Sequence, residues 1–298
     1  VVDNEDGTAT ISCEDGTTVT IGDPEVEPIS GHFDKNSEAF SHWNEDGEIS
    51  TRCAKCHSPT GLIDFLGADG TAAGSVDNAG PTGAMTCITC HNGAVDELTH
   101  VEFPSGEVVD GLGSEAVCMQ CHQGRSSTTA VNDKLAGLDP VPENDDVVPM
   151  KTNTDGTESQ ALGFSDVHYY LAGATMYGDE AKGGYQYDGN SYDGKFDHVM
   201  GRNTCIECHD QHTLKLKVFK CQECHTDVTT AEDLTNIRME GSLIDYDGDD
   251  DITEGVKQEI AGVGAILYEV IQKYATNVVG TSIVYAHSYP YFFIDTNS

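Results

Sequence analysis

Apolar residues recur at helical spacing in one long segment near the C-terminus. Between Glu254 and Ala275 they stand three or four positions apart, at Val256, Ile260, Val263, Leu267, Val270 and Tyr274. This period places them along one face of an α-helix. The sequence therefore predicts a helix over 254–275, and we expect its apolar face to pack against other parts of the protein.

Short runs of β-branched and aromatic residues mark the two ends of the chain. Residues 9–13 and 17–21 flank Glu14-Asp15-Gly16, a pattern typical of a β-hairpin. An isolated hairpin is only marginally stable in water, so we expect this one to pack on its own chain or on a neighbour. The aromatic, β-prone tail over 282–294 would be costly to leave exposed, so it either closes the fold or meets another subunit.

Five copies of Cys-x-x-Cys-His punctuate the weakly periodic sequence between these ends. The cysteine pairs are Cys53 and Cys56, Cys87 and Cys90, Cys118 and Cys121, Cys205 and Cys208, and Cys221 and Cys224. The histidines that follow them are His57, His91, His122, His209 and His225. Two thiols three residues apart lie on one turn and can each bond a haem vinyl group, while the histidine faces the iron. The motifs predict five covalently bound haem c groups.

Other uses of these cysteines explain the pattern less well. Structural zinc sites take Cys-x-x-Cys pairs two at a time, or one pair with two spaced histidines, and need no histidine directly after each pair. Disulfides or a redox dithiol explain neither the repetition nor the histidines. Ten of the eleven cysteines belong to the motifs, which leaves Cys13 as a free, semi-buried or intermolecularly paired thiol.

The haem count changes the expected fold. Five haems in 298 residues leave about 60 residues for each, and 38% of the residues are hydrophobic. The macrocycles must therefore form much of the core. We expect a mostly irregular chain with short helices wrapped around stacked haems and little regular sheet. The predicted parts are a β-hairpin over 1–30 that is a possible subunit contact, a pentahaem core over 31–228, and an acidic loop, helix and aromatic tail over 229–298 packing on the core.

The charge of the chain excludes some partners. Fifty-one acidic residues against fifteen basic ones give a formal net charge of −36. Such a field repels nucleic acid and anionic membranes, and it favours cationic partners or divalent ions. The sequence contains no apolar run long enough to span a bilayer. Because haem c is attached outside the cytoplasm, we expect an exported protein whose signal peptide has been removed, at the cell surface or extracellular, or alternatively periplasmic.

Seven of the twelve histidines lie outside the motifs and could supply the sixth iron ligands. We predict that the distal ligands are His32, His42, His168, His198 and His212, with His100 and His287 left over. His212 follows His209 too closely to reach the far side of the same haem, so it is expected to ligate a neighbouring iron. Methionine is the alternative ligand, at Met85, Met119, Met176 or Met200. With both axial positions filled, iron suits electron transfer, and we expect no enzymatic activity.

An acidic loop resembles part of a calcium site. Asp245, Asp247, Asp249 and Asp251 alternate along it, as in the first half of an EF-hand loop. The pattern departs from the EF-hand, because Asp250 stands where its glycine is expected and Val256 where its last glutamate is expected. Glu254 could substitute for that glutamate. Bound Ca²⁺ or a solvated acidic loop are the two alternatives.

Several segments together resemble the exported multihaem c-type cytochromes of metal-reducing and related prokaryotes. They are Phe40-Ser41-His42-Trp43, Cys53-Ala54-Lys55-Cys56-His57-Ser58, Phe103-Pro104-Ser105-Gly106, Cys121-His122-Gln123-Gly124-Arg125, His168-Tyr169-Tyr170-Leu171-Ala172-Gly173-Ala174, and the acidic loop with the following helix. Some members of this class polymerise into filaments of stacked haems, in which one iron takes a histidine from the adjacent subunit. The resemblance implies that His32 has this role.

The function expected from these features is long-range extracellular electron transfer through stacked haems. The resemblance adds copies of the same chain as partners in a homopolymer, besides a redox donor and an external acceptor. Two alternatives remain: a monomeric periplasmic or surface electron carrier, and a multihaem oxidoreductase with one open iron.

Overall fold

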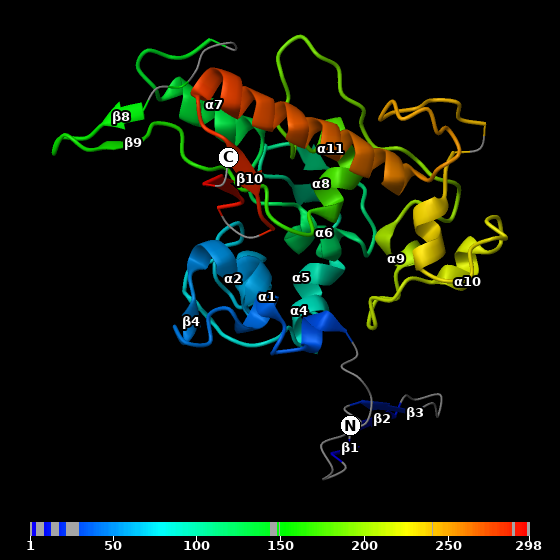
Figure 1. Ribbon diagram of the computed structural model, residues 1–298. Coiled ribbons are helices and arrows are strands. Elements are labelled where there is room, and N and C mark those ends of the chain that lie inside the picture. The colour runs from blue at the N-terminus through cyan, green and yellow to red at the C-terminus, as the bar shows by residue number, and fades with distance from the viewer. Residues whose placement is uncertain are drawn as a thin grey trace. The chain divides into compact units, whose positions relative to one another are not determined.

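Short helices and small sheets are distributed over two units of the chain, Val1–Lys215 and Leu216–Ser298 (Figure 1). The computed structural model describes residues 2–3, 9–12, 18–21, 30–143, 148, 150–239, 241–287 and 290–296. Cys13 and the turn of the predicted N-terminal hairpin lie outside these ranges. The predicted division at residues 30 and 228 stays a prediction.

Short helices joined by long loops make up most of the first unit. Its α-helices are α1 (Glu38–Ser41), α2 (Thr51–His57), α3 (Gly61–Phe65), α4 (Cys87–Cys90), α5 (Gly93–Asp96), α6 (Ala116–His122), α7 (Thr128–Ala136), α8 (Ala172–Tyr177) and α9 (Cys205–Cys208). Two 3-10 helices, η1 (Gly31–Phe33) and η2 (Gly178–Glu180), complete the helical segments of its described part. The prediction of short helices and loops with little regular sheet is confirmed, and the stacked haem core stays a prediction.

The strands of this unit pair only in small antiparallel sheets. They are β1 (Val2–Asp3), β2 (Ala9–Ser12), β3 (Thr18–Ile21), β4 (Glu48–Ile49), β5 (Gly80–Pro81), β6 (Val101–Glu102), β7 (Val108–Val109), β8 (Met150–Thr152) and β9 (Glu158–Gln160). The sheet orders are β1-β2-β3, β4-β5, β6-β7 and β8-β9. In the first sheet, Ala9 pairs with Ile21 and Ser12 with Thr18.

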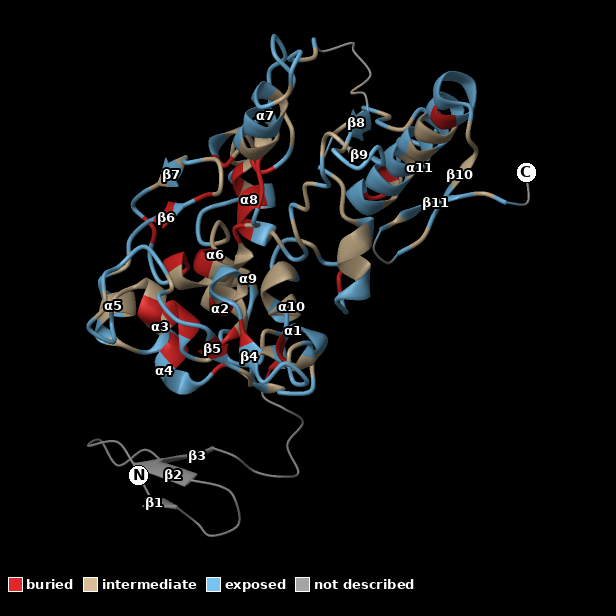
Figure 2. Cartoon of the chain, turned by 90° about the vertical axis from the view of Figure 1, so that its left-hand side faces the viewer, coloured by how far each residue is buried: buried red, intermediate tan, exposed pale blue. Residues whose placement is uncertain are grey.

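The buried core of the first unit is small. Its main cluster consists of Val101, Phe103, Leu112, Ala116, Met119, Ala174, Tyr177 and Ala181. Only fifteen hydrophobic residues are buried in the whole described part of the chain. Buried positions concentrate on α3, α6 and α8 (Figure 2). The described part of the chain therefore buries few apolar side chains for its length.

Close backbone packing fixes the first motif helix. A Cβ atom added to Gly61 would lie 1.8 Å from the carbonyl oxygen of Ala54. Only glycine allows this approach of α3 to α2, since real Cβ contacts are never so short. The adjacent Ser58 is fully buried and donates a 3.0 Å hydrogen bond to the carbonyl of Pro81. The segment that follows the first motif is therefore rigidly held.

The second unit contains the predicted C-terminal helix. Its elements are α10 (Val218–Cys221), η3 (Glu232–Asn236), α11 (Val256–Tyr274), the π-helical turn η4 (Ala275–Val279), and the antiparallel pair β10 (Ile283–Tyr285) and β11 (Phe292–Ile294). The helix over 254–275 is thus confirmed within two residues. Tyr268 and Gln272 on α11 hydrogen-bond to the backbone of Tyr285 and Ile283, which attaches the helix to β10.

The apolar stripe of α11 is not covered within its own unit. Val256, Ile260, Val263, Leu267, Val270 and Tyr274 are 43% to 66% exposed, and α11 shows mostly exposed and intermediate positions in Figure 2. The face that the unit buries instead carries Glu259, which is 1% exposed. The expectation that the stripe packs on the haem core stays a prediction. No helix among the described residues is long and apolar enough to cross a membrane.

Candidate haem-attachment sites

Each of the first four Cys-x-x-Cys pairs lies within one short helix. The helices α2, α4, α6 and α9 contain both cysteines of their motif. The fifth pair begins where α10 ends, and His225 N donates a 2.8 Å hydrogen bond to Cys221 O, so the turn continues through the motif. All five motifs therefore present their two thiols from one helical turn, as attachment to two vinyl groups of one macrocycle requires.

Two of these helices are capped by a residue inside the motif itself. In α4, Thr89 Oγ1 accepts a 3.1 Å hydrogen bond from the backbone N–H of Thr86, and in α9 Glu207 Oε2 accepts a 2.9 Å bond from that of Thr204. This is the backbone half of a capping box. A four-residue helix has little stability of its own, so the cap helps to fix the thiols.

Three motif histidines are oriented by backbone carbonyl groups. The Nδ1 atoms of His57, His122 and His209 lie 2.8, 2.7 and 3.0 Å from carbonyl oxygens of Ala39, Tyr170 and Leu214. A carbonyl oxygen only accepts, so Nδ1 carries the proton in each ring. The Nε2 lone pair is then available to a metal, which is the arrangement typical of metal-ligating histidines.

Three non-motif histidines lie opposite motif histidines. The ring centroids of His57 and His168 are 5.8 Å apart, and those of His91 and His212 are 6.1 Å apart. The third pair, His32 and His122, is separated by 6.0 Å. A metal ion bound about 2 Å from one nitrogen of each ring would hold the two centroids about 6 Å apart. The spacing therefore fits one iron between each pair.

The chemistry around the motifs also fits haem. Paired thiols, a proximal imidazole and a second imidazole form the full set of protein groups that a six-coordinate haem c needs. Ile88 inside the second motif and Phe219 just before the fifth are 59% and 64% exposed. These side chains offer apolar surface that a macrocycle would cover. Bound haem would supply one-electron redox chemistry, and the residues named here would attach and orient it.

The other predicted ligands have different neighbours. The ring of His42 lies 4.7 Å from Trp43, which in turn contacts His57 at 5.0 Å. The backbone N–H of His198 donates to Asn203 Oδ1. Of the two leftover histidines, His100 accepts a hydrogen bond from Gln120 through its carbonyl, and His287 packs 5.2 Å from Tyr285. Met119, one of the alternative ligands, is instead part of the main core cluster.

His32 lies close to a motif histidine of its own chain. Its ring lies beside that of His122, and Met85 N donates a 2.9 Å hydrogen bond to His32 O. Burial, followed by the charge of His122, lowers the pKa of His32. The role in an adjacent subunit that the resemblance implied for His32 stays a prediction.

Thiols of different motifs meet inside the first unit. Cys56 and Cys121 share a hydrogen bond, and so do Cys118 and Cys205. The hydrogen bond that Cys121 donates to Cys56, together with burial, raises the pKa of Cys121 well above the ordinary value of a thiol. These contacts bring the first, third and fourth motifs together, which motif spacing along the chain did not indicate.

The acidic loop forms two clusters of carboxylates. Oxygen atoms of Asp245, Asp247 and Glu259 lie within 4.8 Å of one another, and so do those of Asp247, Asp249 and Glu254. Asp251 is in neither cluster, and its carboxylate accepts hydrogen bonds from the backbone and hydroxyl of Thr253. Glu259 was not predicted as a member of this site. The sequence indicates only that it is an acidic residue near the start of the predicted helix.

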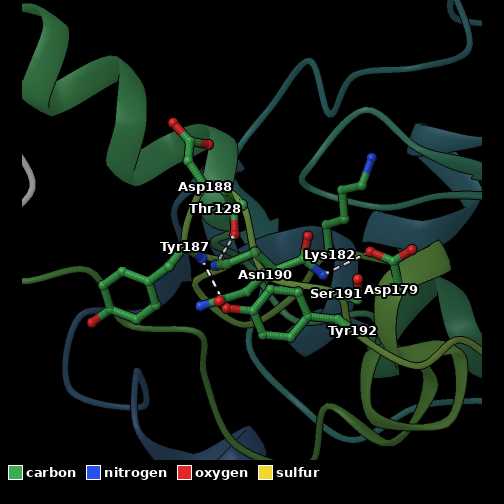
Figure 3. Close-up of a pocket in the computed structure, with 10 residues that line it drawn as sticks. Thr128, Asp179, Lys182, Tyr187, Asp188, Asn190, Ser191 and Tyr192 are labelled. Carbon is green, nitrogen blue, oxygen red and sulfur yellow. Dashed lines mark hydrogen bonds between the residues drawn. The ribbon is translucent and has the colours of Figure 1, made fainter.

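A polar hollow in the first unit is unrelated to the motifs. It is lined by Thr128, Asp179, Lys182, Gln186, Tyr187, Asp188, Gly189, Asn190, Ser191 and Tyr192 (Figure 3). The backbone N–H of Gln186 donates to the hydroxyl of Thr128, which attaches the loop to α7. The backbone N–H of Tyr187 donates to the hydroxyl of Tyr192, which closes the loop. The lining contains no cysteine or histidine, so this hollow offers no haem ligand.

Comparison with known proteins agrees with the arrangement of the motifs. Residues 38–123, which hold the first three motifs, match the family described as cytochrome c7 and related cytochrome c. The chain is 27% identical to the C-type polyheme cytochrome OmcC of Geobacter sulfurreducens, in an alignment that covers 93% of this chain and 38% of OmcC. It is 28% identical to OmcB of the same organism, over 53% of this chain and 23% of OmcB.

The chain therefore spans less than two-fifths of the length of these relatives. No solved structure matches it significantly. Repeated attachment motifs, histidine pairs at the spacing of one metal ion, and these similarities lead to one conclusion. The chain contains a cytochrome c7-like multihaem domain over residues 38–123 and is similar to the polyheme cytochromes of Geobacter sulfurreducens.

Proposed function

We propose that this cytochrome binds five haems, all six-coordinate, and transfers electrons over long distances outside the cytoplasm. The observation that carries the proposal is the pairing of three motif histidines with three non-motif histidines at 5.8 to 6.1 Å. In this proposal His168 serves the first motif, His212 the second and His32 the third. His42 and His198 are kept as the proposed ligands of the remaining two irons.

Two histidine ligands at each iron favour electron transfer over catalysis. An iron with both axial positions filled has no place for a substrate, and its ligands change little between oxidation states. The chain supports this by fixing the rings in advance, since three motif histidines are held by backbone carbonyl groups. Pre-oriented ligands reduce the rearrangement that accompanies each electron transfer.

Assembly into a filament of stacked haems is the finer part of the proposal. Its support is the exposed stripe of α11, where residues 260–268 contain no charged side chain, in a chain of net charge −36. Copies that repel one another through most of their surface would associate best through such an apolar, uncharged face. The alternative is an electron carrier that stays monomeric.

We also propose that the acidic loop binds Ca²⁺. Asp245, Asp247, Asp249 and Glu254 offer oxygen ligands close together, and Oε1 of Glu254 is buried without a hydrogen-bond partner. Burial, together with the neighbouring carboxylates, raises the pKa of Glu254. A divalent cation would relieve this repulsion. The site would fix the loop against α11 and has no redox role.

Export is proposed on chemical grounds, because haem c is attached outside the cytoplasm. The filament proposal favours an extracellular or surface location over a periplasmic one. Without filaments, this argument for the location is lost. The proposed partners are a redox donor, an external acceptor and further copies of the chain.

Spectroscopy and microscopy separate these functions. Low-spin ferric signals alone in the electron paramagnetic resonance spectrum, and no carbon monoxide binding after reduction, are expected for closed irons. A high-spin signal that disappears on ligand binding would identify the oxidoreductase alternative instead. Negative-stain microscopy is expected to show filaments, and discrete particles at every protein concentration would refute polymerisation while leaving electron transfer intact.

A further inference from the structure

The first and third motifs contact each other reciprocally. Cys56 Sγ donates to the carbonyl of Gln120 at 3.8 Å, and Cys121 Sγ donates to the carbonyl of Lys55 at 3.9 Å. Each thiol thus points at the residue directly before the other thiol. The two sulfur atoms also lie close enough to each other to interact. The second cysteines of the two motifs therefore meet, although 65 positions separate them in the sequence.

The third motif contacts the fourth through its other cysteine. The thiols of Cys118 and Cys205 share a hydrogen bond. The carboxylate of Glu115, at the start of α6, accepts a 3.1 Å hydrogen bond from the backbone N–H of Cys205. Glu115 is buried, with 4% exposure, so this bond anchors the first turn of α9 firmly against α6.

The second motif reaches this group of motifs differently. Thr89 donates a 2.8 Å hydrogen bond to the carbonyl of Pro59, just after the first motif, and His91 lies opposite His212, just after the fourth. Cys90 is close enough to interact electrostatically with Cys118 and Cys121. The second motif thus borders the first, third and fourth motifs.

We infer that the third motif is the central site of the first unit, and that its haem is the common neighbour of the haems of the first and fourth motifs. A thioether bond joins each cysteine sulfur directly to the edge of a macrocycle. Two sulfurs in contact therefore bring two macrocycle edges together. The first and third sites are then neighbours in space, although the second motif lies between them in the sequence. The inference rests on the proposed five-haem function.

Lys55 lies where the first and third motifs meet, and we call this contact between Cys56 and Cys121 the junction. Its charge makes the junction detectable through reduction potentials. It lies between the two cysteines of the first motif, and its ammonium sits 3.8 Å above the centre of the Phe65 ring. Its charge interacts with both Cys56 and Cys121. A positive charge at this place stabilises the reduced form of a haem on either side. Two reduction potentials, belonging to neighbouring haems, should therefore depend on Lys55.

The direct test is an experimental structure of the haem-loaded chain with the irons located by anomalous scattering. The iron of the third motif is expected to have those of the first and fourth motifs as neighbours, with the first and fourth farther from each other. The inference would be overturned if the iron of the third motif did not lie between those of the first and fourth motifs. If the irons of the first and fourth motifs were nearest neighbours, the inference would fail as well. Either result would leave the five-haem function standing.

A redox titration followed by absorbance tests the same junction in solution. In Lys55→Met, two of the reduction potentials are expected to fall, whereas Lys55→Arg keeps the charge and should leave them near the wild-type values. The matched control is Lys35→Met, which removes an exposed lysine and should shift none. A shift of one potential or none in Lys55→Met would contradict the shared junction. Haem counting on the same samples reveals separately whether the five-haem proposal itself has failed.

Discussion

The imidazole rings of His91 and His212 face each other at 6.1 Å, although 121 positions separate the residues in the sequence. His212 follows His209 of the fourth motif by three residues. The loop after the fourth motif therefore lies beside the second motif. From the sequence we expected His212 to serve a neighbouring iron, and the motif histidine beside it is His91 of the second motif.

Replacing the proposed distal ligand of the second motif should raise one of the reduction potentials. In His212→Met, a thioether replaces an imidazole, and Met/His ligation raises the reduction potential of a haem. One of the five potentials is expected to rise in a spectroelectrochemical titration. The control is His100→Met, which changes an exposed histidine outside the three pairs. Equal shifts in both variants would show that His212 is not a ligand.

Thr89 should be important for stability as well as for haem positioning. It is 2% exposed, caps α4, and donates to the carbonyl of Pro59 at 2.8 Å. Thr89→Val keeps the shape but leaves buried polar groups unpaired, which costs about 1–3 kcal/mol. Chemical denaturation should show this loss, whereas Thr175→Val, at an exposed position, should stay within about 0.5 kcal/mol of wild type. Equal stabilities would rule out this role for Thr89.

The buried ion pair between Arg238 and Glu259 should make the second unit sensitive to acid. Their side chains are 13% and 2% exposed, and the hydrogen bond from Arg238 is the main reason why the pKa of Glu259 is lowered. A lowered carboxyl pKa stabilises the fold above the ordinary pKa, and this contribution is lost as the pH falls through the folded value. Thermal unfolding of wild type should therefore show a drop in stability in acid that Glu259→Gln lacks.

The control for this experiment is the exposed pair of Glu269 and Lys273, one turn apart on the same helix. Surface pairs of this kind contribute little, so Glu269→Gln should keep both the stability and the acid response of wild type. At neutral pH, Glu259→Gln should be clearly less stable than Glu269→Gln, because it leaves Arg238 partly unpaired. Indistinguishable variants would contradict the account of the buried pair.

Calcium should stabilise the second unit through the acidic loop. At a Ca²⁺ concentration about 100 times Kd, the free energy of unfolding should rise by about 2.7 kcal/mol, and a chelator should reverse the effect. Asp247→Asn should abolish the response, since Asp247 belongs to both carboxylate clusters. Asp46→Asn, an exposed acidic residue in the other unit, should respond like wild type. Calorimetry that shows no Ca²⁺ dependence would leave the loop as a solvated acidic segment.

Local features of this protein could be predicted from the sequence, because nearby residues determine them. The apolar period from Val256 to Tyr274 gave the helix, and the spacing of the Cys-x-x-Cys pairs gave one-turn geometry for the thiols. The β-prone tail does form the pair β10 and β11.

Contacts between distant segments could not be predicted in this way. The sequence favours five of the seven histidines outside the motifs as ligands, but only the folded chain shows that His168 lies beside His57. The junction between Cys56 and Cys121 depends on how α2 packs on α6. Periodicity alone also could not reveal that Glu259 is the buried residue of α11 while Ile260 is exposed.

The most direct test of the central claim is the intact mass of the purified, denatured protein. Covalently attached haems survive denaturation, so the measured mass should exceed that of the polypeptide by five haems. Loss of one increment in Cys87→Ser/Cys90→Ser would assign it to the second motif. A polypeptide that carries fewer haems, or zinc in their place, would contradict the account.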